Sequence, residues 1–236
     1  MQPHYSITSL RPESHQFDVQ LDFSLNELEQ QQLRLPNWIP GSYMIRDFAK
    51  NIVEISAFCN GEALQIKQID KSTWELEDRV FNDHAWAISI KYTVYAWDLS
   101  VRTAHLDLTH GFFNGTSVFL ELVGFAEQAC VLSIQQPPHP ACEQWAVATS
   151  LSKHHVDEPG FGIYHAENYD DLIDHPVELG TFKRLTFEAC GVPHDIVLTG
   201  QFECDEQRLV DDLKVICEHH INFFGQPAPV SYYTFL

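Results

Sequence analysis

Histidines are the side chains in this sequence best suited to metal or proton chemistry, and there are thirteen of them. A catalytic zinc helix carries two histidines four residues apart, so that both face one ion, with a glutamate between them as general base. No two histidines here have that spacing. The nearest approach is Glu218-His219-His220, but adjacent positions on a helix point ~100° apart and cannot both face one ion. We interpret this group as a helix end where histidine favours the helix dipole.

A second group of polar residues, His105, Asp107 and Thr109, would share one face of a strand. An acyl-transfer site also needs a Ser or Cys nucleophile in a sharp, glycine-flanked turn. The sequence has no such turn, and it has no Gly-x-Gly-x-x-Gly loop for phosphate or a dinucleotide. A third group is predicted to be solvated surface rather than a metal site: His154, His155, Asp157 and Glu158.

The stretch at residues 35–51 reads Leu-Pro-Asn-Trp-Ile-Pro-Gly-Ser-Tyr-Met-Ile-Arg-Asp-Phe-Ala-Lys-Asn. Its prolines fix φ and remove backbone donors, and its glycine and aromatic residues indicate a rigid, packed loop. Arg46 stands beside Asp47, which predicts an ion pair near a packed surface. Two interpretations stay open: a structural corner with a local ion pair, or a loop that shapes a ligand cleft. Under the second, the candidate substrate-binding residues are Tyr43, Arg46 and Asp47.

A second candidate loop spans residues 111–116, where two phenylalanines precede Asn-Gly. One interpretation places Phe113 as an aromatic wall and Asn114 as a carboxamide at the mouth of a cleft, where an amide both donates and accepts hydrogen bonds. The other makes the two phenylalanines a buried pair beside a tight turn, since phenylalanine is usually a core residue.

The elements that must position these loops are predicted from alternation of apolar and polar residues, which has the period of a half-buried strand. Asn60-Gly61 supplies both positive φ values of a hairpin turn. Residues 152–161 are polar and rich in turn-forming residues, and residues 231–236 indicate the opening of another strand. The clearest strands are predicted at 17–24, 53–57, 86–97, 99–109 and 130–134.

One long helix is predicted over residues 205–224, with Asp205 as N-cap, apolar residues at spacings of three to five, and Gly225 then Pro227 at its end. Many short strands followed by one helix predict a mainly β fold. We expect an antiparallel β-sandwich or saddle-like domain, with a boundary near residue 180.

Composition excludes some classes of partner. The formal net charge of −19 repels nucleic-acid phosphates and anionic lipid, and no Lys/Arg cluster offsets it. No apolar run approaches the ~18 residues needed to span a bilayer, and no signal peptide is recognisable at the start. The six cysteines have no Cys-x-x-Cys pair, so we expect reduced thiols and a cytoplasmic protein.

Four stretches, taken together and in order, resemble one known family. They are residues 36–51, residues 110–119, residues 169–180 (Tyr-Asp-Asp-Leu-Ile-Asp-His-Pro-Val-Glu-Leu-Gly) and residues 205–236. The chain is similar to the amino-terminal portion of the glycyl aminopeptidase family, which are zinc metallopeptidases of the gluzincin type and usually carry a PDZ domain. The resemblance covers nearly the whole chain.

This resemblance implies two units: an amino-terminal β domain at 1–180, and at 181–236 the beginning of an α+β, thermolysin-like catalytic domain. It implies zinc for the full-length family and a peptide substrate with a small amino-terminal residue. The zinc motif, the general base, the remainder of the catalytic domain and the PDZ domain are expected in polypeptide beyond Leu236. In related metallopeptidases the loop corresponding to Phe113 and Asn114 lies near the pocket for the substrate amino terminus.

Two functions therefore stay open. In the first, the chain positions peptide substrates for a zinc aminopeptidase but lacks the metal ligands and is inert alone. In the second, it is a self-standing β-sandwich module that binds peptides or glycans through aromatic loops at residues 38–48 and 112–114.

Overall fold

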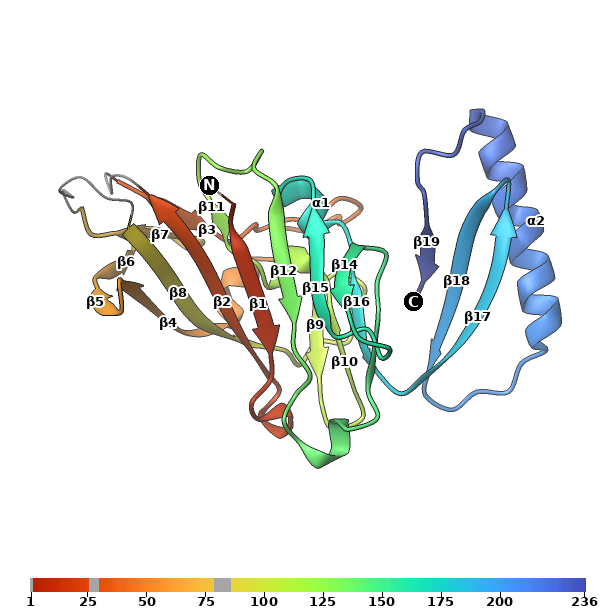
Figure 1. Cartoon of the computed structure of the whole chain (residues 1–236), viewed down its shortest axis with the longest axis horizontal. Helices are drawn as coiled ribbons and strands as arrows, with labels where there is room; N and C mark the ends of the chain where they lie inside the picture. Colours follow the sequence, from red (N-terminus) through yellow and green to blue (C-terminus); the bar gives the residue numbers. More distant parts are fainter. Residues whose placement is uncertain (1, 26–29, 79–85) are drawn as a thin grey trace.

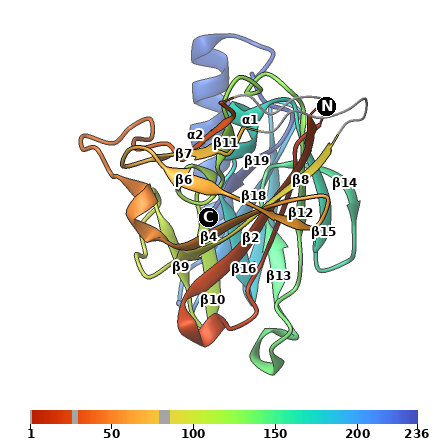
Figure 2. The ribbon, with the colours of Figure 1, turned by 90° about the vertical axis from the view of Figure 1, so that its left-hand side faces the viewer.

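A computed structural model of the chain describes residues 2–25, 30–78 and 86–236. These residues form a mainly β structure, as the sequence predicts. Three sheets pack together in the first part of the chain, and a smaller sheet with one long helix follows at the other end of the long axis (Figure 1). Viewed from the end opposite that helix, strands of the largest sheet lie at the front of the molecule, and the long helix lies at the back (Figure 2).

The largest sheet has eight strands, in the order β14-β15-β12-β1-β2-β8-β4-β5. Alternation along β2 and β8 sends apolar side chains to the core and polar side chains to the outer face. The strands are β1 (His4–Thr8), β2 (Gln16–Leu25), β4 (Ile52–Cys59), β5 (Glu62–Leu64), β8 (Trp86–Tyr95), β12 (Cys130–Ile134), β14 (Ser152–Val156) and β15 (Gly162–Ala166).

Two four-stranded sheets complete this part, in the orders β13-β16-β10-β9 and β11-β3-β7-β6. The first consists of β9 (Ala104–Leu106), β10 (His110–Phe113), β13 (Ala146–Ala148) and β16 (Val177–Gly180). The second consists of β3 (Gln32–Arg34), β6 (Ile66–Gln68), β7 (Thr73–Leu76) and β11 (Glu121–Leu122). Short helices connect them: η1 (Pro12–Ser14), η2 (Phe48–Asn51), η3 (Gly115–Ser117), η4 (Pro140–Cys142) and α1 (Tyr169–Ile173).

The last sheet has the order β17-β18-β19 and is covered by a long helix (Figure 1). Its strands are β17 (Phe182–Ala189), β18 (Val192–Thr199) and β19 (Tyr233–Phe235), and the helix is α2 (Glu206–Phe224). One side of α2 packs on the sheet through Leu209, Leu213, Cys217 and Ile221. The helix also carries four large apolar side chains that are about half or more exposed: Val215, Ile216, Phe223 and Phe224.

The described residues contain two separate hydrophobic clusters. The first draws buried side chains from Tyr5 to Leu179 and includes all three sheets of the first part. The second is built on Phe187, Ala189 and Ile196, with α2 packed against them. No buried residue belongs to both clusters, so each part has a core of its own. The domain assignment at residues 1–180 and 181–236 is taken up as a proposal below.

Local signals in the sequence are confirmed where a turn or cap fixes the backbone. Asn60 and Gly61 have φ of 49° and 85° and join β4 to β5 in an antiparallel hairpin. Asp205 is the N-cap of α2, and its side chain accepts a hydrogen bond from the Arg208 amide at 3.1 Å. Gly225 follows the helix with φ of 98°.

Three expectations are wrong in part. The strand predicted at 99–109 forms only as β9, because residues 98–103 make a tight loop in which Thr103 Oγ1 donates to the Asp98 carbonyl at 2.6 Å. The segment at 152–161, expected to consist of turns, contains strand β14 at the edge of the largest sheet. Pairing is not wholly antiparallel, since β1 pairs with β12 and β18 with β19 in parallel.

Candidate functional site

The loop at residues 36–51 is closed on itself by hydrogen bonds around Ser42. The indole Nε1 of Trp38 donates to the Ser42 carbonyl at 2.9 Å, and Ser42 Oγ donates to the Met44 carbonyl at 2.9 Å. Arg46 Nε donates to Ser42 Oγ at 3.0 Å. Side chains therefore satisfy polar groups that no neighbouring strand pairs, and the predicted rigid loop has a physical basis.

The tip of this loop presents apolar side chains to solvent. Tyr43 has a relative exposure of 103%, and Met44 and Ile45 are each 60% exposed. Three consecutive exposed apolar residues on a hydrogen-bonded base offer a contact surface without an internal packing role. This is the strongest feature of the loop that favours binding over a purely structural corner.

The predicted ion pair between Arg46 and Asp47 is wrong for the described residues. The Arg46 guanidinium is engaged with Ser42 Oγ, while the nearest cation to the Asp47 carboxylate is Lys71, at 3.9 Å. Asp47 adopts a left-handed conformation with φ of 49° at the start of η2, which turns its side chain away from its neighbour.

A second loop, residues 97–103, joins the loop at 36–51 to the turn after β10. Arg102 Nη2 donates to the Gly41 carbonyl at 3.3 Å, and the Asn114 amide donates to the Thr103 carbonyl at 2.9 Å. The loop at 36–51 and the turn at 111–116, far apart in sequence, are thus linked through residues 97–103. We call these three segments together the loop face.

Phe113 and Asn114 are held inside the loop face rather than displayed on it. Phe113 is fully buried, with edge-to-face contacts to Phe17 and Phe119 at centroid distances of 5.4 and 5.7 Å. Asn114 is 7% exposed, and its Oδ1 accepts from the Thr116 amide at 3.1 Å, which caps η3. The structure thus matches the buried-pair interpretation of Phe113, and Asn114 positions the turn.

Phe112, the other phenylalanine of the loop at 111–116, lines a cavity of about 280 Å³ beside the loop face. Gly111 decides which phenylalanine points inward: an added Cβ there would lie 2.9 Å from Leu106 Cδ1, so this side of β10 faces the core. By alternation Phe113 follows it inward and Phe112 points outward. The other residues lining the cavity are Leu99, Ser100, Val101, Glu178 and Leu236.

The floor of this cavity carries a buried carboxylate with two donors. Glu178 Oε1 lies 3.1 Å from His110 Nδ1 and accepts from Thr199 Oγ1 at 2.8 Å. The hydrogen bond to Glu178 raises the pKa of His110 above its ordinary value, burial opposes this, and the negative charges of Glu178 and Asp107 add to the rise. Burial disfavours the charged form of Asp107, but bonds from Thr109, His110 and His105 outweigh it and lower the Asp107 pKa to about 2.

One of the predicted polar residues of the second group, His105, belongs to a packed aromatic row. The rings of Trp97 and His105 are stacked at 5.0 Å, and those of His105 and His110 lie 4.9 Å apart. His105 Nε2 lies 3.4 Å from Asp107 Oδ2. No serine or cysteine nucleophile joins this row among the contacts of the described residues.

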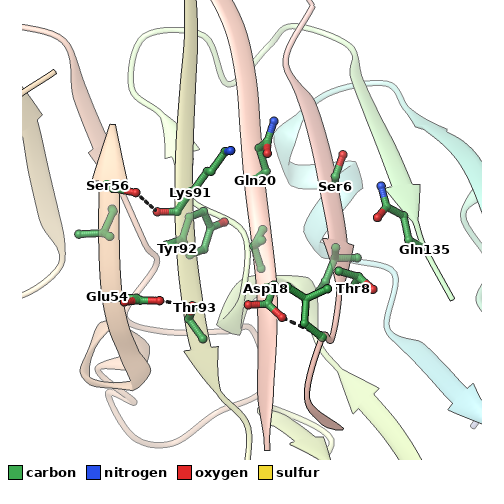
Figure 3. A pocket seen from close by; sticks show the side chains of 14 residues that line it. Ser6, Thr8, Asp18, Gln20, Glu54, Ser56, Lys91, Tyr92, Thr93 and Gln135 are labelled. Atoms are coloured by element: carbon green, nitrogen blue, oxygen red, sulfur yellow. Dashed lines mark hydrogen bonds between the residues drawn. The ribbon is translucent and has the colours of Figure 1, made fainter. Parts of the chain in front are cut away.

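The start of the loop at 36–51 contacts a different cavity, of about 510 Å³, which reaches Glu121 and α1. The two candidate segments of the sequence therefore border two different cavities rather than one. A further cavity, about 560 Å³, lies on the outer face of the eight-stranded sheet (Figure 3). Its side chains stand in rows across β1, β2, β8 and β4, as on any sheet face that is in contact with water.

The described residues do not provide a zinc site. No group of three or more His, Cys, Asp or Glu side chains within the described ranges is placed to hold a metal ion. The rings of His219 and His220 on α2 lie 6.1 Å apart, and His154 packs edge-on against His165 on the neighbouring strand. The six cysteines all lie in the described ranges, and the structure joins none of them in a disulfide. No helix in the described part of the chain is long and apolar enough to cross a membrane.

Comparison with solved structures gives three informative neighbours. A crystal structure of an aminopeptidase N family protein from Idiomarina loihiensis is 41% identical, with a TM-score of 0.91 over 100% of this chain and 38% of that one. The M1 zinc metallopeptidase of Deinococcus radiodurans is 11% identical, with a TM-score of 0.53 over 99% of this chain and 55% of that one. Leukotriene A4 hydrolase of Saccharomyces cerevisiae is 12% identical, with a TM-score of 0.53 over 95% and 34%.

The last two likenesses show the fold alone, and the chain spans only 38% of the length of the Idiomarina protein. A comparison with curated protein sequences gave no match. The model of the peptidase M61 N-terminal domain matches residues 4–181, which is most of the chain and includes the loop at 36–51. The chain therefore belongs to the peptidase M61 family, and residues 4–181 are its N-terminal domain.

Proposed function

We propose that residues 1–180 form a substrate-positioning domain of a glycyl-aminopeptidase-like zinc metallopeptidase, and that residues 181–236 begin its catalytic domain. Membership of the M61 family supports the first part of this proposal. The two separate hydrophobic clusters and the end of the family match at residue 181 support the boundary. The remainder of the catalytic domain and a PDZ domain are the proposed partners, and the cytoplasm is the proposed location.

The observation that carries the positioning role is the exposed apolar tip at Tyr43, Met44 and Ile45, tied to the neighbouring loop by the bond from Arg102 to Gly41. A peptide laid across this face would meet apolar side chains on a base that is already ordered, so little conformational entropy is lost on binding. The M1 zinc metallopeptidase of Deinococcus radiodurans, which shares the fold, binds a Tyr-Ser-Ala substrate. We propose peptides with a small amino-terminal residue as substrates.

Individual residues take the following proposed roles. Tyr43 contacts the peptide, while Arg46 and Asp47 hold the loop through Ser42 and Lys71. Phe113 and Asn114 act indirectly, by fixing the turn that supports the loop face. Zinc, its ligands and the general base belong in this proposal to polypeptide outside these residues, and no step of hydrolysis is assigned to the chain.

The test uses the full-length enzyme that contains this sequence and compares Tyr43→Ser with Phe202→Ser. Phe202 is also an exposed aromatic residue, but it follows β18 and lies outside the three segments of the loop face. We expect Tyr43→Ser to raise KM for Gly- or Ala-amide substrates by roughly three- to tenfold with little change in kcat, because it removes binding rather than chemistry. Asn114→Ala should also raise KM while the domain stays folded. An unchanged KM in both Tyr43→Ser and Asn114→Ala would contradict the positioning role.

A second candidate is a self-standing module that binds peptides or glycans. It is favoured by exposed aromatic rings at Trp38 and Tyr43, which are 44% and 103% exposed and could stack on a ligand. Binding and hydrolysis assays on the 236-residue chain by itself distinguish the two candidate functions. Millimolar or tighter binding of peptides or oligosaccharides without zinc-dependent hydrolysis favours the module, and robust zinc-dependent turnover by the isolated chain would refute both readings.

A further inference from the structure

The segment from Val118 to Glu121 is buried, and within the described part of the chain only Glu121, at its end, pairs with a strand. Tyrosine hydroxyls bond to the backbone of the residues before it. Tyr92 donates to the Val118 carbonyl at 2.8 Å, Tyr169 to the Phe119 carbonyl at 2.7 Å and Tyr5 to the Leu120 carbonyl at 2.8 Å. Burial raises the pKa of all three phenols, so each hydroxyl stays protonated and donates. Three buried donors in succession fix this backbone and the residue that follows it.

The residue so positioned is Glu121, a carboxylate that is only 8% exposed. Arg34 on the adjacent strand donates to Glu121 Oε2 from Nε at 3.1 Å and from Nη2 at 2.7 Å. Both bonds end on Oε2. Among the described residues, Oε1 is not one of the atoms that are both fully buried and without a hydrogen-bond partner, so a ligand can reach it. Glu121 Oε1 and the Nη1 edge of Arg34 are therefore left for another partner.

Both residues line the cavity of about 510 Å³ at the start of the loop at 36–51. An acceptor with negative charge and a donor with positive charge stand side by side, and together they are electrically neutral. A lone cation or anion would compete with the existing ion pair, whereas a dipolar ligand matches both free edges at once. Apolar side chains lie around the pair and leave room for an uncharged substituent: Leu35, Trp38, Ala126 and Ile173.

We propose that this cavity is a binding site for a free α-amino acid with an apolar side chain. The ligand ammonium donates to Glu121 Oε1, and its carboxylate accepts from the Nη1 edge of Arg34. Its side chain packs against the partly exposed Ile173 and the exposed face of Trp38. This site shares Trp38 with the loop face but does not include the exposed tip at Tyr43, and the inference does not depend on the proposed peptidase function.

Isothermal titration calorimetry on the 236-residue chain tests the proposal with L-leucine and glycine as ligands, and with methylamine and acetate as single-charge probes. We expect L-leucine to bind with millimolar or tighter affinity, more tightly than glycine, and both single-charge probes to bind at least tenfold more weakly. No binding of L-leucine at ~10 mM, or binding of methylamine or acetate as tight as that of L-leucine, would overturn the proposal.

The decisive variant is the double substitution Arg34→Gln with Glu121→Gln. It removes both charges together and so avoids a buried carboxylate without its partner. We expect at least tenfold weaker binding of L-leucine, and full retention in Glu54→Gln, a matched change of an exposed carboxylate bonded to Thr93 on the outer sheet face. Equal binding in the double variant would overturn the assignment.

A second variant keeps the test independent of any folding defect in the double variant. Trp38→Leu removes a half-exposed ring at the rim of the cavity and leaves the ion pair in place. We expect it to weaken binding of L-leucine more than binding of glycine, because only the former uses the apolar wall. Equal loss for both ligands, or none, would contradict the proposed orientation.

Discussion

Thr199 Oγ1 donates to Glu178 Oε1 at 2.8 Å, and this bond joins the last residue of β18 to the strand β16 of the preceding part. A second tie lies nearby, where Arg184 Nη2 donates to the Val147 carbonyl at 3.3 Å. The two parts of the chain have separate cores, so these polar contacts help to fix how one part sits on the other.

Thr199→Val should weaken this connection. It leaves the buried Glu178 with one donor fewer, and hydrogen bonds to charged groups contribute about 1.5–3 kcal/mol. We expect faster cleavage by a protease in the segment between β16 and β17 and a lower midpoint of thermal unfolding. Thr186→Val on the exposed face of β17 is the matched control and should change neither measurement.

The stability of the chain should fall as pH rises through the pKa of His110. Glu178 raises that pKa in the folded state above the ordinary value of 6.5, and the facing groups Asp107 and His105 are part of the same cluster. The contribution of the protonated ring is fully present below the unfolded pKa and is lost as pH passes the folded pKa. Urea unfolding between ~pH 5.5 and ~pH 8.5 measures it.

His110→Gln is the control for this pH dependence. Glutamine keeps a donor to Glu178 but does not titrate, so the difference in unfolding free energy between the two proteins should shrink as pH rises. A difference that is flat across the range would show that the ring does not carry the effect.

Tyr169→Phe should destabilise the chain by about 1–2 kcal/mol, because it leaves the buried carbonyl of Phe119 without its donor. Tyr95→Phe removes a hydroxyl of the same kind from a ring that is 42% exposed and should be nearly neutral. Chemical denaturation of both variants provides the comparison. Equal midpoints would mean that water replaces the lost donor at Phe119.

Gly115→Ala should destabilise the chain more than Gly111→Ala. At Gly115 an added Cβ would lie 2.8 Å from Ile173 Cα and 3.1 Å from the Leu172 carbonyl, which are backbone atoms that cannot rotate away. At Gly111 the nearest atom belongs to the Leu106 side chain, at 2.9 Å, and a side chain can adjust. Overpacking costs typically about 1–3 kcal/mol, and thermal unfolding of the two variants would rank them.

The sequence predicts this fold best where a few neighbouring residues determine the backbone. Asn60-Gly61 tolerates the positive φ values of its turn, and Asp205 caps its own helix, so both features follow from local chemistry. The strand predicted at 99–109 fails for a related reason: Thr103 and its neighbours form side-chain bonds that compete with strand pairing.

The candidate site was harder to predict because its contacts join distant parts of the chain. Whether Phe112 or Phe113 faces the core depends on the contact between Gly111 and Leu106, which alternation alone leaves undecided. Tyr5 and Leu120 are 115 residues apart in sequence, and no local pattern links that hydroxyl to that carbonyl. Arg46 stands next to Asp47 in the sequence, yet backbone geometry separates their side chains.

The exposed end of α2 affects how the purified chain will behave. Phe223 and Phe224 are 73% and 83% exposed at the end of the helix, with ring centroids 5.0 Å apart. Adjacent apolar rings in water promote self-association at high protein concentration. Storage at low concentration, or replacement of these two phenylalanines by serine, should therefore lengthen the time for which a solution of the chain stays clear.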